Sequence, residues 1–143
     1  MSQSEVNASV KRLQAAKLIH EKDMGERPIL AAVEEFLIHA VKYMFPAQYG
    51  ARIVRGMPTS YAAEPLNKII DAGDNPIPVW PDSCGKSRGL YFYPIYVSAP
   101  AAAKRDPVLY ARLAMVDAIR DGNARERKLA QEHLLRSLRG ERG

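Results

Sequence analysis

The sequence predicts a mainly α-helical protein, on three observations. Residues 2–19, 28–44 and 106–139 carry apolar side chains at helical spacing, between residues that commonly begin and end helices. Residues 45–105 are interrupted by eight prolines and five glycines, which predicts an irregular segment with at most short strands. The composition, 47% hydrophobic and 26% charged, is typical of a chain that folds.

The 143 residues are expected to form a single domain, which can bury about two thirds of its unfolded surface. A single cysteine, Cys84, excludes an internal disulfide framework, and no apolar stretch reaches the roughly 20 residues that a membrane span needs. We therefore expect a cytoplasmic protein with no membrane partner. The net charge of +5 favours an anionic partner, and nucleic acid is the commonest such partner.

The first segment opens with a capping-box pattern, in which Ser2 is followed three residues later by Glu5. Val6, Val10 and Leu13 then recur at spacings of four and three, which predicts an amphipathic helix with a narrow apolar stripe. The opposite face carries small, polar and basic side chains: Ser4, Asn7, Ala8, Lys11 and Arg12. The polar stretch "HEKDMGER" that follows predicts a loop or a short hairpin.

Residues 28–44 are predicted to form a second helix, because Pro28 suits its first position and no breaker follows before Pro46. Its apolar side chains cover most of its circumference. A helix of this kind lies either in the centre of the core or in a subunit interface.

Residues 45–105 are predicted to wrap irregularly over the helices and to pack aromatic rings on them. The stretch "GLYFYPIYV" is rich in strand-forming residues but is split by Pro94, so that any strand there is short or at an edge.

Residues 106–139 predict a pair of helices. Asp106 followed by Pro107 is a strong helix start, "DGN" ends the first helix, and Asn123 caps the second. The apolar positions of the first helix are expected to face inward: Val108, Leu109, Leu113, Val116 and Ile119.

The cap Ser-x-Ser-Glu-Val at residues 2–6, the stripe and the ending Lys-Arg-Leu-x-x-Ala-x-Leu-Ile together resemble the recognition helix of MarR-like winged helix-turn-helix transcriptional regulators. The resemblance covers residues 1–27, as a partial helix-turn-helix and wing, and implies a winged-helix-derived N-terminal part. It implies that one set of residues binds DNA: Ser4, Asn7, Ala8 and Lys11 at base edges, Arg12 at bases or phosphate, and Lys17, Lys22 and Arg27 at the backbone. Asn suits adenine, whereas Lys and Arg suit guanine or phosphate.

Such regulators have two helices before the recognition helix, and the sequence has no counterpart of them. We expect either that Met1 is an internal methionine of a longer natural chain or that the helix docks elsewhere. The apolar stripe then needs cover from another part of the chain or from a second subunit. A homodimer is the simplest expectation, and its two-fold symmetry suits palindromic sites.

The remainder of the chain contains the stretches "FLIHAVKYMFPAQYG", "RGMPTSYAAEPL", "PVWPDSCGKSRG", "YPIYVSAP" and "RDPVLYARLAMVDAIRDGNARERKLA". On these stretches it resembles an uncharacterised bacterial family. Some members of that family are encoded near nucleotidyltransferase-type toxins, which implies the role of an antitoxin or regulator.

The sequence contains no convincing pattern of catalytic or cofactor-binding residues. "GKS" at residues 85–87 lacks the glycine that a phosphate-binding loop needs five positions earlier, where Trp80 stands. The three histidines show no ligand spacing and the chain has one cysteine, so that we expect no metal. Glu34 and Glu35 diverge on a helix and nothing brings a histidine to Cys84, so that we also expect no cofactor and no enzyme. The loop "RGMPTSY" can hold a phosphate or carboxylate, but equally it can form a turn closed by its own hydroxyls.

The sequence therefore predicts a DNA-binding transcriptional regulator or antitoxin-like protein that inserts its first helix into the major groove. The alternative is a protein-interaction module, for example a toxin-neutralising partner, that binds no DNA. A third possibility is a small-molecule sensor that uses the aromatic residues around Trp80 and residues 91–96.

Overall fold

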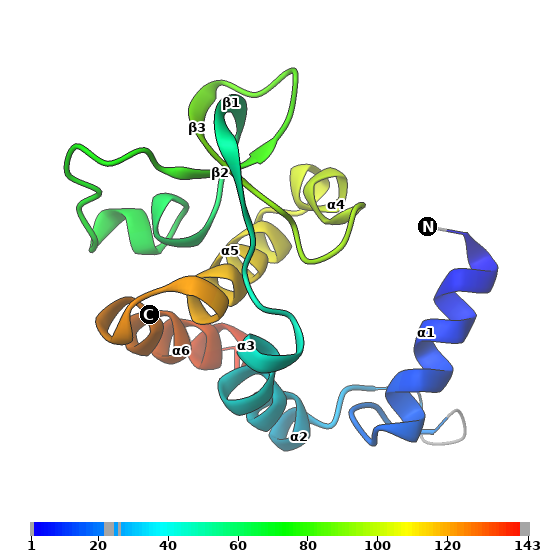
Figure 1. Ribbon diagram of the computed structural model, residues 1–143. Helices are drawn as coiled ribbons and strands as arrows, with labels where there is room; N and C mark the ends of the chain where they lie inside the picture. Colours follow the sequence, from blue (N-terminus) through cyan, green and yellow to red (C-terminus); the bar gives the residue numbers. More distant parts are fainter. Residues whose placement is uncertain (1, 22–24, 26, 141–143) are drawn as a thin grey trace. The chain divides into compact units, whose positions relative to one another are not determined.

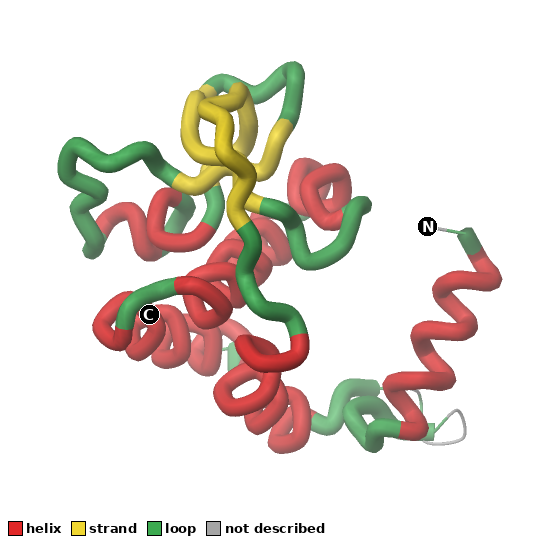
Figure 2. Tube along the Cα trace, in the orientation of Figure 1, coloured by secondary structure: helices red, strands yellow, loops and turns green. Residues whose placement is uncertain are grey.

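The computed structural model describes residues 2–21, 25 and 27–140 of the protein. It divides into two compact units, residues 1–39 and residues 40–143, called here the N-terminal and C-terminal units. Helices account for more of the described residues than strands do (Figure 2). The predicted mainly helical character is confirmed at this coarse level, although a small sheet makes the fold mixed α/β.

The N-terminal unit contains α1 (Gln3–Ala15) and α2 (Leu30–Glu35), and α2 continues into the π-helical η2 (Phe36–Ala40). Between α1 and α2 the chain turns back on itself, and Ile19 and Pro28 form an antiparallel bridge. Of the two structures predicted after the first helix, a loop or a short hairpin, this bridge favours the hairpin. The boundary between the units falls within η2, and α3 (Val41–Met44) belongs to the C-terminal unit.

The second predicted helix is largely confirmed, since the chain is helical from Leu30 to Met44. Its predicted start is wrong, because residues around Pro28 serve the hairpin, where the Ile29 N–H donates to the Leu18 carbonyl at 2.8 Å. A central place in the core is also wrong for this segment. Val41 is its one buried residue, whereas Tyr43 and Met44 are 76% and 63% exposed. The alternative, a subunit interface, stays a prediction.

The C-terminal unit contains a closed three-stranded barrel (Figure 1). Strand β1 (Tyr49–Pro58) pairs antiparallel with both β2 (Pro78–Pro81) and β3 (Ser87–Phe92), which pair parallel with each other. Two 3₁₀ turns, η3 (Ser60–Ala62) and η4 (Leu66–Lys68), lie between β1 and β2. The prediction of an irregular segment with at most short strands is therefore wrong for β1, which spans ten residues.

The glycines explain this error. A Cβ atom on Gly56 would lie 2.0 Å from the Trp80 carbonyl oxygen, and one on Gly89 would lie 2.1 Å from the Ile77 carbonyl oxygen. These residues therefore permit the close approach of strands in a very small barrel rather than interrupting them.

Three helices complete the C-terminal unit: α4 (Ala99–Arg105), α5 (Pro107–Asp121) and α6 (Ala124–Leu138), with α6 packed along α5 (Figure 1). The predicted caps are confirmed. Asp106 accepts hydrogen bonds from the N–H groups of Val108 and Leu109, and Asn123 forms a capping box with Glu126. The inward position predicted for Val108 is wrong, because it lies in the first turn of α5 and is 54% exposed.

The barrel and the helices share an aromatic core. Trp80 and Phe92 are almost fully buried together with Ala103 of α4, and Tyr110 packs against them. The ring centroids of Trp80 and Tyr110 are 5.7 Å apart. The prediction that the middle segment packs aromatic rings on helices is thus confirmed for these residues.

Candidate nucleic-acid interface

Helix α1 begins at the predicted capping box. The Ser2 hydroxyl accepts from the Glu5 N–H at 3.2 Å, and the Glu5 carboxylate accepts from the Ser2 N–H at 2.6 Å. These hydrogen bonds hold the pKa of Glu5 below its ordinary value. Two otherwise unpaired amides are satisfied, which fixes the first residue of the helix and hence the direction of each later side chain.

Four of the predicted DNA-binding residues share one exposed face of α1. At about 100° per residue, Ser4, Asn7, Ala8 and Lys11 fall within a sector of about 100°, and all four are exposed. Arg12 lies at the edge of this sector, where its guanidinium donates to the Ser9 hydroxyl at 3.0 Å. Small residues and an amide in the middle, with two cations toward the C-terminal end, form a surface that can enter a groove closely.

Lys17 lies directly after α1 in the left-handed conformation, with φ +61°. The Leu18 N–H donates to the Leu13 carbonyl at 2.9 Å, and the Lys17 N–H donates to the Gln14 carbonyl at 3.0 Å. This pair of bonds is the Schellman motif, in which glycine usually occupies the left-handed position. The helix therefore ends with an exposed lysine where local stability alone would favour glycine.

The hairpin after α1 returns Arg27 toward the helix end. The His20 N–H donates to the Arg27 carbonyl at 2.8 Å, next to the bridge between Ile19 and Pro28. The Gln14 amide also donates to the His20 carbonyl, at 3.4 Å, which ties the hairpin to the last turn of α1. The structure thus brings Lys17 and Arg27 to the same end of α1, whereas Lys22 lies outside the described residues.

The apolar stripe of α1 is incompletely covered. Val6 and Leu13 are 38% and 39% exposed, Val10 is half-buried, and no described residue of α1 is buried. In the predicted recognition helix this stripe packs on preceding helices.

The C-terminal unit contains a buried polar cluster that was not predicted from the sequence. Asp117 of α5 is 1% exposed, and its carboxylate accepts from Thr59 Oγ1 at 2.6 Å, Trp80 Nε1 at 2.8 Å and Arg120 Nη1 at 2.7 Å. Burial raises the pKa of Asp117, while the contacts with Thr59, Arg120 and Trp80 act in the opposite direction. This carboxylate thus connects Thr59, which directly follows β1, with β2 and α5 in the interior of the unit.

Arg120 extends the cluster to the start of the C-terminal unit. Its Nε donates to the Phe45 carbonyl at 2.6 Å and its Nη2 donates to the Pro46 carbonyl at 3.3 Å, while its guanidinium lies 5.6 Å from the Phe92 ring centroid. A signal was present in the sequence, since Asp117 and Arg120 stand three residues apart within the apolar run of α5.

The cluster changes two earlier interpretations. Thr59 of "RGMPTSY" donates its hydroxyl to Asp117, so that this hydroxyl serves neither a phosphate nor a local turn. Trp80 is 1% exposed and belongs to the core, which places it away from any open ligand site of the kind that a sensor would need.

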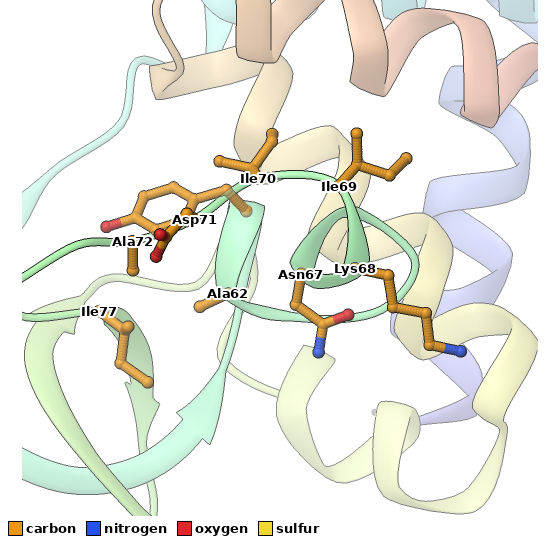
Figure 3. Close-up of a pocket in the computed structure, with 9 residues that line it drawn as sticks. Ala62, Asn67, Lys68, Ile69, Ile70, Asp71, Ala72 and Ile77 are labelled. Atoms are coloured by element: carbon orange, nitrogen blue, oxygen red, sulfur yellow. The ribbon is translucent and has the colours of Figure 1, made fainter.

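A surface cavity of about 380 Å³ lies beside η4 (Figure 3) and is lined mainly by aliphatic side chains with Asn67, Lys68 and Asp71. In Figure 3 the side chains of Asn67 and Lys68 lie on the opposite side of the ribbon from those of Ile69 and Ile70. Lys68 also pairs with Glu64 at 3.3 Å. The polar groups do not converge on one point, as they do in most ligand sites.

Among the described residues, no three His, Cys, Asp or Glu side chains lie together as a metal site would require. Nor does the described part of the chain contain a helix with the length and apolarity needed to cross a membrane.

Comparisons with known proteins returned no matching family model, no matching curated protein and no matching solved structure.

Proposed function

We propose that this protein is a DNA-binding transcriptional regulator or antitoxin-like protein that places the exposed face of α1 in the major groove. One observation carries the proposal. A capped helix with a small, polar and basic face leads through a left-handed lysine into a hairpin that returns a second cation, Arg27, beside the helix end. A recognition helix followed by a wing has this order of parts.

The residues divide into two roles. Asn7 can pair with an adenine edge, while Lys11 and Arg12 can reach guanine acceptors. Ser4 and Ala8 are small enough to let the helix approach the bases. Lys17 and Arg27, at the C-terminal end of α1, suit phosphates and would fix the depth and register of the helix.

Selection of duplexes from a randomised pool tests the proposal. The full-length protein is expected to enrich a common sequence, and its affinity for that duplex is expected to fall steeply with salt as phosphate counterions are released. Failure to enrich any sequence would contradict groove reading by α1.

A protein-interaction module is the second candidate, and the exposure of Val6 and Leu13 favours it. Packing of this stripe against a toxin or against a second copy of the chain would bury it. Affinity for such a partner should change little with salt, because the contact is apolar. The salt dependence of binding therefore separates the two candidates.

Replacement of Lys17 by glycine is expected to stabilise the N-terminal unit while it weakens binding to DNA. Lys17→Gly relieves the left-handed strain, and we expect the N-terminal unit to gain about 0.5 kcal/mol after the added backbone freedom of glycine is subtracted. Affinity for the selected duplex should fall about threefold or more, because one phosphate contact is lost. Amide hydrogen exchange in α1 and duplex titrations measure the two effects. Lys17→Arg is the control and should bind as the wild type does; equal binding by the glycine variant would remove Lys17 from the interface.

A further inference from the structure

A pair of arginines faces solvent on the C-terminal unit. Arg55 of β1 and Arg88 of β3 are directly opposite each other in the antiparallel ladder, and both are exposed. Like charges in this arrangement destabilise a sheet. Among the residues that the structure describes, neither guanidinium has an ion-pair partner. The pair is therefore an unneutralised positive site on a rigid element, the three-stranded barrel (Figure 2).

Asp82, an acidic residue next to Arg55, already forms an ion pair with Lys104. Asp82 lies beside this site, since its N–H donates to the Arg55 carbonyl at 3.0 Å. Its carboxylate, however, lies 2.6 Å from Lys104 Nζ and also accepts from the Cys84 N–H at 3.0 Å. Lys86, which immediately precedes β3, is exposed and adds a further positive charge near the strand.

The distribution of charge along the chain also places the excess positive charge in the C-terminal unit, which contains Arg55 and Arg88. Residues 40–143 carry 16 lysines and arginines against 10 acidic residues, a net charge of +6, whereas residues 1–39 carry five against six, a net charge of −1. The N-terminal unit, which holds the proposed groove-reading helix, therefore supplies no net attraction for a polyanion. Long-range attraction to DNA has to come from the C-terminal unit.

We propose that Arg55 and Arg88 form a second, sequence-independent contact with the phosphate backbone of duplex DNA. The choice of DNA as the polyanion rests on the proposed function of α1, but the contact itself does not involve α1. A phosphate oxygen near both guanidiniums would accept charge-assisted hydrogen bonds and offset the repulsion across the ladder. Because both units belong to one chain, binding by one raises the effective concentration of the other near the duplex.

The test uses the full-length protein, the selected duplex and a scrambled duplex of the same length. The double variant Arg55→Gln/Arg88→Gln is expected to weaken binding to both duplexes by the same factor. The slope of log affinity against log salt should become shallower by about 1.8, which corresponds to two lost phosphate contacts. The double variant Arg125→Gln/Lys128→Gln on α6 removes the same charge from two other exposed residues and should change the slope much less.

The variant Arg88→Glu tests whether weaker DNA binding results from loss of folding rather than from loss of the phosphate contact. Opposite Arg55, the new carboxylate forms a cross-strand ion pair, so that the melting temperature should equal or exceed that of the wild type. Binding to both duplexes should nevertheless be weaker than that of Arg88→Gln. Binding by Arg88→Glu at the wild-type level would overturn the proposal.

The outcomes for the two units are distinguishable. An unchanged salt slope in the double variant Arg55→Gln/Arg88→Gln overturns the second contact and leaves the proposed function of α1 intact. The positive charge of Arg55 and Arg88 would then serve another polyanion, such as an acidic protein. A shallower slope for Arg55→Gln/Arg88→Gln, together with unchanged sequence discrimination in the double variant Lys11→Ala/Arg12→Ala, would support the second contact and contradict groove reading by α1. No binding to either duplex by the wild type overturns both.

Discussion

Replacement of Asp117 by alanine is expected to lower the free energy of unfolding by about 3–5 kcal/mol, the usual cost of breaking a buried ion pair. The change leaves the Arg120 guanidinium without its carboxylate, although its side chain is only 4% exposed. It also leaves the Thr59 hydroxyl and the Trp80 N–H without their acceptor in the core. Urea unfolding of the full-length protein measures the loss.

Matched variants show whether the cluster acts as a unit. Thr59→Val removes one donor to Asp117 and is expected to cost about 1–2 kcal/mol. Trp80→Phe removes a second donor and is expected to cost more, because it also leaves a cavity in the core. The double variant Asp117→Leu/Arg120→Met should be less destabilised than the sum of its single changes, because no uncompensated charge stays buried. A cost below about 1 kcal/mol for Asp117→Ala would show that the cluster contributes little to stability.

Removal of the cations at Lys11 and Arg12 is expected to weaken binding to the selected duplex at least tenfold, a loss of about 1.4 kcal/mol or more. Both side chains are exposed on α1, and alanine is the best helix former, so that the helix itself should not be weakened. Discrimination between the selected and the scrambled duplex should fall as well, since base contacts are lost. Fluorescence anisotropy titrations with both duplexes measure the two effects.

The control for this pair is Arg125→Ala/Lys128→Ala, which removes the same charge from exposed positions of α6. It should preserve discrimination between the duplexes. Equal affinity and equal discrimination in the Lys11→Ala/Arg12→Ala variant would exclude this face of α1 as the reading surface.

The features predicted correctly from the sequence are those that depend on neighbouring residues. The Ser2 capping box and the caps at Asp106 and Asn123 are formed within three residues along the chain, and all three are present. The polar face of α1 follows in the same way, because helical periodicity alone places Asn7 and Lys11 together. The binding role of that face stays a prediction.

The features that the sequence did not reveal depend on tertiary contacts. Gly56 and Gly89 look like breakers until the strands that approach them are known, so that β1 was not predicted. Asp117 has partners 37 and 58 residues away in the chain, and nothing local indicates Trp80 or Thr59 as donors. Pairing across the barrel likewise sets Arg55 opposite Arg88, which a linear reading of two separated segments does not show.

The amide NMR spectrum of the full-length protein, recorded during titration with the selected duplex, locates the contact surface residue by residue. Groove reading predicts the largest shift changes at Ser4, Asn7, Ala8 and Lys11, with smaller ones at Val6 and Leu13 on the opposite side of the helix. Changes confined to Val6, Val10 and Leu13, or spectra of α1 that the duplex leaves unaltered, would contradict it.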